Sequence, residues 1–392
     1  MNFFNIIAAI KNTVINSVPN DSFDNTRLLR LKDYYYDGRY YFTGIYQKNP
    51  LSQTILQTFH DGTNHVWQAS KKISGIRSTD EGETHSGIIE LVQPPDTVSG
   101  ASIGVQDVGG GYDSNGRYHL LYDAHGNDNS STAQNQARYR YSDDDGATWS
   151  DFQILFEAGG TEFWSVRLMG KMIENNGVLL KPYYRSTRTE PYFSKRCILR
   201  SVDYGLNWTE IDVDVSNEYI NEGALIALGN KVIYAARKEE GDKGFKFYLS
   251  NDNGLNWSIQ GETAFGEIIN KSHPPHLAKF KIKGQDVFCF YLYNRSTDNY
   301  MGIYGKPTDI FNSVSGWNLN TKTIFFNIRN NFFNNPSGGI AGSTSGYGSV
   351  DHINGDLFAK GTIFTDYTGQ SGIVHFDLPT THYQTIINEL GL

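Results

Sequence analysis

The residues best suited to chemistry in this chain are a few arginines, carboxylates and one tyrosine at the ends of strand-like segments. Glu222 and Arg237 stand fifteen residues apart in NEGALIALGNKVIYAARKEE, around two apolar runs. Arg295 lies between two further strand-like runs, and Tyr347 stands in the turn-like SGYGS. Because the formal net charge is −8, a site for an anion must gather its arginines locally. Taken alone, each of these residues also fits an ordinary position, since an arginine beside a strand is usually solvated and the chain has 25 tyrosines.

The elements that would position these residues are indicated by a short repeated pattern. It reads Ser-x-Asp-x-Gly-x-Thr/Asn, followed by Trp or, once, by His. The copies are STDEGETH at Ser78–His85, SDDDGATW at Ser142–Trp149, SVDYGLNW at Ser201–Trp208 and SNDNGLNW at Ser250–Trp257. Their serines are 64, 59 and 49 residues apart, and a turn motif at such a period indicates an array of supersecondary units.

Each copy predicts a tight corner between two strands. The Asp accepts bonds from backbone amides, the Gly takes a positive φ, and Thr or Asn adds a second side-chain bond. The Trp packs beneath the turn, so the first copy, with His85 in that place, is expected to form a looser corner. Further strands are predicted around Val287–Tyr293 and Leu357–Thr365, and a short helix after Pro379.

The repeated pattern resembles the Asp box of sialidases and related β-propellers; the alternative is four ordinary hairpins in another β fold. The resemblance implies an all-β fold, a six-bladed β-propeller of the sialidase type with short terminal helices and about 60 residues in each four-stranded blade. We expect one propeller domain over residues 23–392, after a lead-in segment over residues 1–22. Within that segment, residues 3–18 are interpreted as a short amphipathic helix rather than a cleaved signal. In such propellers the ligand sits at the axis, on loops that leave the innermost strands.

The resemblance to bacterial sialidases extends from about residue 25 to residue 378. TRLLRL–DGRYYFTGIY is similar to the family's first blade, YRIPSL–DGTLLAFAE, and places Arg27 on the first of three arginines, although Leu29 replaces the motif's proline. VQDVGGGYDSNGRYHLLY is similar to FSDPSYLVD–TGRIFLLY and places Asp107 on a sugar-binding aspartate. The alternative role for Asp107 is to cap a turn before the glycine run.

Three further segments carry the remaining site residues of the family. NEGALIALGNKVIYAARKEE is similar to NE–VVELSDGRLLLNSR and carries Glu222 together with Arg237, the second arginine. FCFYLYNRSTDNYMGIY places Arg295 on the third arginine. SGYGSVDHINGDLF is similar to SGYSSL–LPDGTI and places Tyr347 on the nucleophile.

The chemistry that the resemblance implies is the hydrolysis of a sialic acid glycoside. The sugar carries a carboxylate on its anomeric carbon, which Arg27, Arg237 and Arg295 would hold through charge-assisted bonds. A carboxylate nucleophile would be repelled by that anion, so a tyrosine attacks the oxocarbenium-like centre instead. Since a phenol has a pKa of about 10, Glu222 would take the proton of Tyr347.

The general acid is the least defined member of this set. In the family it is an aspartate in a long loop of the first blade, and here that loop is expected over about Gln47–Ser70. Asp61 is the only acidic residue in that segment and is our choice, with His60 and His65 beside it. His65 is the alternative, because phage endosialidases resemble the family yet lack the aspartate.

Two other groups depart from the family or have an open role. The glutamate that supports the first arginine is replaced near Thr362, where Asp366 is the candidate substitute. Trp164, Tyr183 and Tyr184 fit the floor of a glycan pocket, but core or rim packing is the simpler interpretation.

Composition excludes several other classes of protein. The acidic net charge argues against general nucleic-acid binding, and no run of 18 apolar residues predicts a membrane span. Cys197 and Cys289 are expected to be free buried thiols rather than a disulfide framework. No metal or other cofactor is expected, the expected partner is a sialylated glycan or acidic polysaccharide, and an extracellular or virion-associated location is favoured. The oligomeric state stays open.

Three functions compete at this level. The leading hypothesis is an exo-acting glycosidase that removes a terminal sialic acid or a related nonulosonic acid. The second is an endo-acting, phage-type depolymerase of a sialic acid polymer. The third is a glycan-binding propeller without catalysis, against which the presence of both Glu222 and Tyr347 argues.

Overall fold

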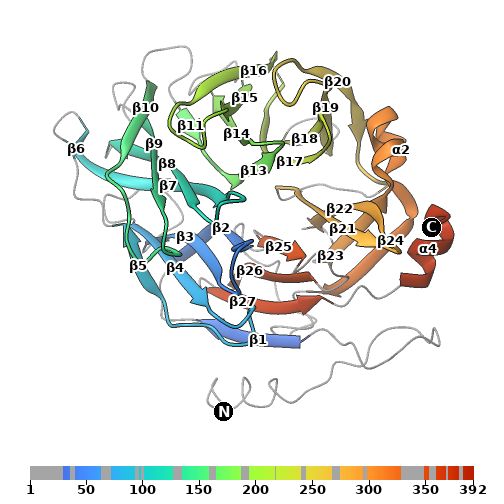
Figure 1. The fold of residues 1–392 in the computed structure, drawn as a ribbon, viewed down its shortest axis with the longest axis horizontal. Coiled ribbons are helices and arrows are strands. Elements are labelled where there is room, and N and C mark those ends of the chain that lie inside the picture. The colour runs from blue at the N-terminus through green and yellow to red at the C-terminus, as the bar shows by residue number, and fades with distance from the viewer. Residues whose placement is uncertain are drawn as a thin grey trace.

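The fold is a β-propeller, seen in a computed structural model of the chain. The structure describes residues 30–35, 40–62, 72–92, 97–98, 101–126, 135–158, 165–186, 194–216, 218–239, 244–266, 274–294, 297, 299–327, 348–352, 359–367, 370–378 and 383–392. Within these residues the strands form six sheets, which follow one another in chain order around a common axis (Figure 1). The first strands of neighbouring sheets contact one another at that axis. The expectation of an all-β propeller is therefore confirmed.

The first three sheets are built mainly from antiparallel strands. The first contains β2 (Tyr40–Lys48), β3 (Ile55–Gly62), β4 (Lys72–Ser78) and β5 (Ile89–Val92). The second contains β7 (Ala101–Tyr112), β8 (Tyr118–Gly126), β9 (Asn135–Ser142) and β10 (Gln153–Ala158), with β6 (Thr97–Val98) and β12 (Gly170–Lys171) beside β7. The third contains β11 (Ser165–Arg167), β13 (Ile173–Asn175), β14 (Val178–Ser186), β15 (Ser194–Ser201) and β16 (Thr209–Ser216).

The other three sheets each have four strands. The fourth contains β17 (Ile220–Leu228), β18 (Lys231–Lys238), β19 (Phe245–Ser250) and β20 (Ser258–Thr263). The fifth contains β21 (His276–Ile282), β22 (Gln285–Asn294), β23 (Asn299–Gly305) and β24 (Asn318–Asn327). The sixth contains β25 (Gly348–His352), β26 (Ala359–Tyr367), β27 (Gln370–Leu378) and β1 (Arg30–Tyr35). The strands predicted around Val287–Tyr293 and Leu357–Thr365 correspond to β22 and β26.

The described helices are short and peripheral. They are α2 (Pro307–Asn312), the 3-10 turn η1 (Val314–Gly316) and α4 (Tyr383–Leu390). The helix predicted after Pro379 is confirmed as α4, whose Ile386, Ile387 and Leu390 pack on the core of the fifth sheet. The lead-in residues 1–22 lie outside the described residues. Among the described helices, none has the length and apolarity needed to span a membrane.

Burial follows the position of a strand within its sheet. Every residue of β3 and nearly every residue of β17 is buried, because neighbouring sheets pack on both faces of an inner strand. The outermost strand β20 is instead exposed or half-buried along its length. Aromatic rings fill the space between sheets, as where Phe245, Phe290 and Trp317 meet between the fourth and fifth sheets. Cys197 and Cys289 are free and buried, as expected.

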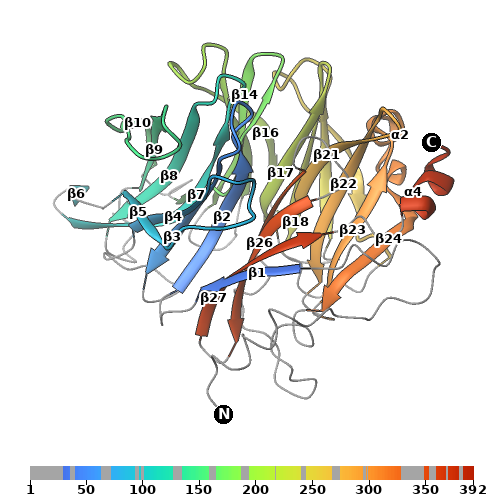
Figure 2. The same cartoon turned by 60° about the horizontal axis from the view of Figure 1, so that its bottom comes forward.

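The chain closes the ring in a way that corrects one expectation. The segment from Arg27 was expected to open the first blade, but β1 pairs antiparallel with β27, Arg30 lying opposite Asp377. Figure 2 shows β1 along the outside of the sixth sheet. The innermost strand of the first sheet is β2. An N-terminal strand added to the last sheet joins the two ends of the chain, which supplies the physical reason for this pairing.

The four repeated corners are confirmed, each between the two outer strands of a sheet. In the second sheet, Asp144 Oδ1 accepts from the Thr148 amide (2.8 Å) and Oδ2 from the Thr148 hydroxyl (2.6 Å). The Ser142 hydroxyl donates to Asp144 and accepts from the Gly146 amide (2.7 Å). Gly146 has φ +79°, and Asp145 before it has φ +55°. The other three corners repeat these bonds with their own residues.

Candidate active site

Glu222 and Arg237 form a buried ion pair at the inner end of the fourth sheet. Their side chains are 7% and 6% exposed, and the Arg237 guanidinium donates to the Glu222 carboxylate. The pairing of β17 with β18 shifts register between Ile220 and Gly223, so Asn221 and Glu222 together face Arg237. Such a bulge re-aims side chains at a strand end and recurs beside active sites. The predicted juxtaposition of Glu222 and Arg237 is thus present in the structure.

A second carboxylate completes the surroundings of Arg237. The guanidinium also pairs with Glu239, whose Oε1 accepts a hydrogen bond from the side-chain Nδ2 of Asn221 (3.0 Å). The Arg237 guanidinium is thus held between two carboxylates. The ion pairs fix its plane, which favours bidentate recognition of an anion.

Three neighbouring residues were not identified from the sequence. Tyr219 precedes β17, and burial raises the pKa of its phenol; the cations of Arg167 and Arg237 oppose this shift, and the Glu222 carboxylate adds to it. Arg167, at the end of β11, lies with Nη1 3.8 Å from an oxygen of Asp123, which is completely buried in β8. The charged cluster therefore draws on the second, third and fourth sheets. No common spacing links these residues in the sequence, so only the fold brings them together.

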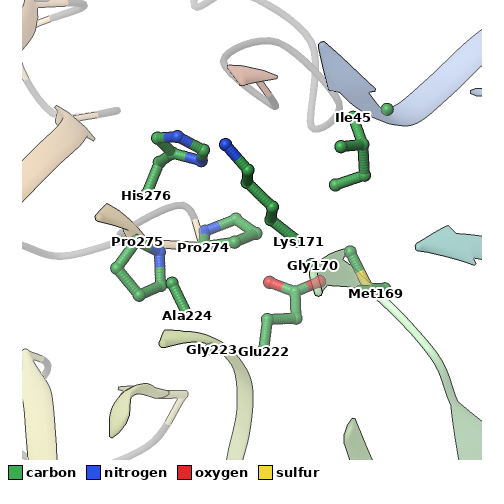
Figure 3. Close-up of a pocket in the computed structure, with 11 residues that line it drawn as sticks. Ile45, Met169, Gly170, Lys171, Glu222, Gly223, Ala224, Pro274, Pro275 and His276 are labelled. Atoms are coloured by element: carbon green, nitrogen blue, oxygen red, sulfur yellow. The ribbon is translucent and has the colours of Figure 1, made fainter. Parts of the chain in front are cut away.

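A small cavity near the axis adjoins this cluster at Glu222. It has a volume of about 40 Å³, room for a few water molecules. Figure 3 shows Glu222 pointing into it, with Lys171 and His276 on its wall. The rest of the wall comes from Gly44, Ile45, Met169, Gly170, Gly223, Ala224, Pro274 and Pro275. Four sheets contribute to this lining, as expected for a cavity at the axis.

The wall on the side of Lys171 is a segment that crosses between sheets. β12 pairs in parallel with β7, with Gly170 opposite Gly109 and Lys171 opposite Gly110. A Cβ on Gly109 would lie 2.4 Å from the Leu168 carbonyl, so this close approach requires glycine. The buried Lys181 ammonium holds the same segment by donating to the carbonyls of Met169 (2.6 Å) and Gly170 (2.8 Å).

The glycine run after Asp107 therefore lies inside a strand. β7 continues to Tyr112, so the alternative in which Asp107 caps a turn before these glycines is wrong. The register of β7 against β8 shifts between Val105 and Val108, which sets Asp107 in a bulge opposite Asp123. The backbone of Asp107 is thus at the same end of the propeller as Glu222; its side chain lies outside the description.

Asp61 lies in a strand rather than in the expected loop. The loop predicted over Gln47–Ser70 is interrupted by β3, which extends to Gly62, because ILQTFHDG pairs with both β2 and β4. Asp61 is completely buried and accepts from the Ser74 hydroxyl at 2.7 Å. His60 is also completely buried, and His65 lies outside the described residues.

The other predicted site residues fall outside the described residues. These are Arg27, Arg295 and Tyr347; β22 ends one residue before Arg295, and β25 begins one residue after Tyr347. Thr362 and Asp366 belong to β26, but their side chains are not described. Tyr183 and Tyr184 are buried at 2% and 8% exposure, which agrees with core packing; Trp164 is not described.

One group of potential metal ligands occurs in the described part of the chain, away from the axis. It consists of Cys197, Glu210 and Asp212 on β15 and β16. Lys195 already lies 2.6 Å from Asp212, and Arg185 pairs with Glu210. Burial raises the pKa of the Cys197 thiol to about 12. These cations and the protonated thiol occupy the positions that a divalent ion would need.

Comparison with known proteins shows which proteins this chain is similar to. No protein-family model matches the chain. An anhydrosialidase of Macrobdella decora is 32% identical over 156 residues, which is 36% of this chain and 20% of that protein. A sialidase of Paraclostridium sordellii is 25% identical over 232 residues, or 52% and 56% of the two chains. The matches thus span about a fifth and about half of these two relatives.

Solved structures show the same fold. A leech intramolecular trans-sialidase aligns with a TM-score of 0.67 at 13% identity, over 92% of this chain and 70% of that one. An intramolecular trans-sialidase from Ruminococcus gnavus aligns with a TM-score of 0.63 at 13% identity, over 92% and 96%. The chain therefore shares the β-propeller fold of these trans-sialidases. With the sequence relatives, the resemblance of this chain to the sialidase superfamily is confirmed.

Proposed function

We propose that this protein is a six-bladed sialidase-type propeller that cleaves glycosidic bonds of sialic acids or related nonulosonic acids. The observation that carries the proposal is the buried Glu222–Arg237 pair, whose Glu222 lines the axial cavity in a chain that is similar to sialidases. The six sheets would be the six blades. A carboxylate base beside a fixed guanidinium is what a tyrosine nucleophile and an anionic sugar require.

In the proposed reaction, Arg27, Arg237 and Arg295 bind the sugar carboxylate. Glu222 takes the proton of the Tyr347 phenol as its oxygen attacks the anomeric carbon. The bond to the leaving alcohol breaks, and the alcohol oxygen receives a proton from the general acid. A water molecule, which gives a proton to the deprotonated general acid, then attacks the same carbon and releases the free sugar, and Glu222 returns its proton to the departing Tyr347 phenolate.

Binding and acid roles complete the proposal. Asp107, in the β7 bulge, would bond the sugar, and Arg167 adds a cation on the same side. Asp61 is proposed as the general acid, and His65 is its alternative. Because Asp61 is completely buried against Ser74, it reaches a substrate only after the end of β3 moves. This requirement makes Asp61 the role most exposed to refutation.

A second candidate function is intramolecular transfer. The 32% identical relative is an anhydrosialidase, and the aligned leech structure carries a 2,7-anhydro sugar. In that reaction a hydroxyl of the sugar itself attacks the anomeric carbon in place of water. The product then lacks one molecule of water relative to the free acid.

One experiment separates these possibilities. The protein is incubated with a 4-methylumbelliferyl sialoside and, in parallel, with polysialic acid on a gel. Fluorophore release with free acid as the product supports the exo-hydrolase, and the dehydrated product supports intramolecular transfer. Shortening of the polymer without fluorophore release indicates an endo-acting enzyme. Tight glycan binding with neither reaction would leave a lectin and refute the proposal.

A further inference from the structure

The innermost strand of the sixth sheet, β25, is held by bonds to three other sheets. The Ser349 hydroxyl donates to the Tyr46 carbonyl of β2 (3.3 Å), and His276 Nε2 of β21 donates to the Val350 carbonyl (2.5 Å). Asp351 Oδ2 accepts from the Lys48 amide of β2 (3.1 Å). Three consecutive residues of one short strand are thus fixed in addition to their pairing with β26.

The remaining bond joins β25 to the second sheet. Lys171 of β12 places its ammonium 3.0 Å from Asp351 Oδ1, and the two side chains are 16% and 19% exposed. Lys171 also lines the cavity into which Glu222 points (Figure 3). The Lys171 side chain therefore links the wall of the cavity that Glu222 lines to β25, the strand that begins one residue after Tyr347.

The Lys171 side of this bond is rigid. The backbone of its segment is fixed by the Lys181 ammonium and by the bond from the Met172 amide to the Gly110 carbonyl (2.8 Å). The segment also packs closely against β7, because a Cβ added at Gly109 would meet the carbonyls of Leu168 and Gly170, and one at Gly111 would meet the Met172 carbonyl. An ion pair between a fixed segment and a short strand adds little net stability, but it can hold the strand in one position.

We propose that Lys171 and Asp351 are positioning residues of the active site. Their ion pair fixes the position and direction of β25 relative to the cavity that Glu222 lines. It would thereby fix where the proposed nucleophile Tyr347 approaches its proposed base, Glu222. The inference rests on the proposed function for the identity of the nucleophile, but the fixation of β25 itself does not. Neither residue is required to touch the substrate.

The test compares four variants of the full chain with the wild type. Asp351→Asn and Lys171→Met remove the ion pair, Lys171→Arg retains it, and Glu210→Gln is the matched control. Glu210 forms a pair of similar burial with Arg185, far from the axis on β16. The readouts are kcat and KM on a fluorogenic sialoside, hydrogen exchange of the amides of residues 348–352, and the thermal midpoint.

The expected result is a split between turnover and binding. Asp351→Asn and Lys171→Met should lower kcat at least tenfold with KM within threefold, and amide exchange should rise at least tenfold in β25 but not in β17. Lys171→Arg and Glu210→Gln should stay within twofold of the wild type. Should either single variant not fold, the Lys171→Met/Asp351→Asn double variant, which leaves no unpaired charge, takes its place.

Other outcomes overturn the inference. If amide hydrogen exchange in β25 is unchanged in the variants, the Lys171–Asp351 pair does not hold this strand and the inference is refuted. If exchange rises equally in all sheets, the pair has a merely structural role. If Tyr347→Phe keeps wild-type turnover, the proposed nucleophile fails. Hydrogen exchange in β25 then decides alone whether the Lys171–Asp351 pair holds the strand. Failure of the proposed function and failure of this inference are therefore distinguishable.

Discussion

The outer corners and the axial cluster of this propeller are built in opposite ways. Each corner uses residues within seven positions of one another and repeats the same bonds in four sheets, as at Ser142–Trp149 and Ser250–Trp257. The axial cluster takes single residues from several sheets, such as Asp123, Arg167 and Glu222, and none of its contacts is repeated. The corners position strands, and the cluster has charges that a β framework alone does not require.

This difference assigns separate consequences to changes in each region. Burying a charged pair costs desolvation free energy, so such a pair at the axis is better explained by a role in a site than by stability. A repeated local turn instead contributes to stability at every copy. Changes at the axis should therefore affect the reaction more than folding. Changes at a corner should affect folding and leave the reaction intact.

The largest effect is expected for the base. Glu222→Gln keeps the shape of the side chain but cannot take a proton, so turnover should fall by on the order of 100- to 10,000-fold. The measurement is kcat on a fluorogenic sialoside, with circular dichroism to verify the fold. Glu262→Gln, which removes a carboxylate paired with Lys238 on the outer strand of the same sheet, is the control and should keep full turnover. Equal turnover of the two variants would remove Glu222 from the mechanism.

The next effect is expected for the arginine beside it. Arg237→Ala should lose about 2–4 kcal/mol of transition-state stabilisation, seen as a fall in kcat/KM, because the anion loses a cation while Glu222 and Glu239 lose their partner. Arg237→Lys keeps the charge without the planar fork and should recover only part of the loss. Full recovery by lysine would show that bidentate geometry is not needed there.

The corners and most strands were predictable because their determinants are local. The Ser-x-Asp-x-Gly spacing encodes the bonds found at Asp144, strand-like segments predicted β22 and β26, and the tail after Pro379 predicted α4. The position of β1 was not predictable from its own residues, because its partner β27 is more than 300 residues away. Pairing of that kind is decided by how the ring closes.

The site was predictable only where two of its residues share a hairpin. Glu222 and Arg237 lie on adjacent strands, so a fixed spacing brings them together. Arg167, Asp123 and Tyr219 come from separate segments and carry no common signal. The strand at Asp61 was missed because ILQTFHDG shows no alternation of apolar and polar residues, since all eight of its residues are buried.

A smaller effect, on stability alone, is expected at a corner. Asp144→Ala removes an acceptor of both Thr148 donors and of Ser142, which should lower the free energy of unfolding by about 1–2 kcal/mol with unchanged turnover. Asp143→Ala is the control, since Asp143 is exposed and bonds only Arg117 among the described contacts. It should cost under about 0.5 kcal/mol in urea unfolding. A loss of turnover in Asp144→Ala at full stability would contradict the separation of the two regions.

The first corner differs from the other three and gives the smallest effect. His85 stands where the others have Trp, and its ring stacks on His375 of β27 with centroids 3.9 Å apart. Tyr46 bonds His85, and His375 Nε2 lies 2.6 Å from Gln57 Oε1. The expected looser corner is thus a contact between the first and last sheets.

Acid should weaken this contact. Burial lowers the pKa of His375 well below 6.5, and His85 adds to the shift. Below about pH 6.5 the unfolded chain binds a proton at His375 that the folded chain does not bind. The free energy of unfolding therefore decreases as the pH falls below about 6.5, and this group leaves it unchanged above that pH. The slope from this one group is at most about 1.4 kcal/mol per pH unit. Urea unfolding of the wild type and of His375→Gln from about pH 8 to about pH 5 isolates it by difference. His85→Trp should retain most of the slope, because burial is the first cause of the shift. Parallel stability curves for the wild type and His375→Gln would show that the seam between the first and last sheets does not sense protons.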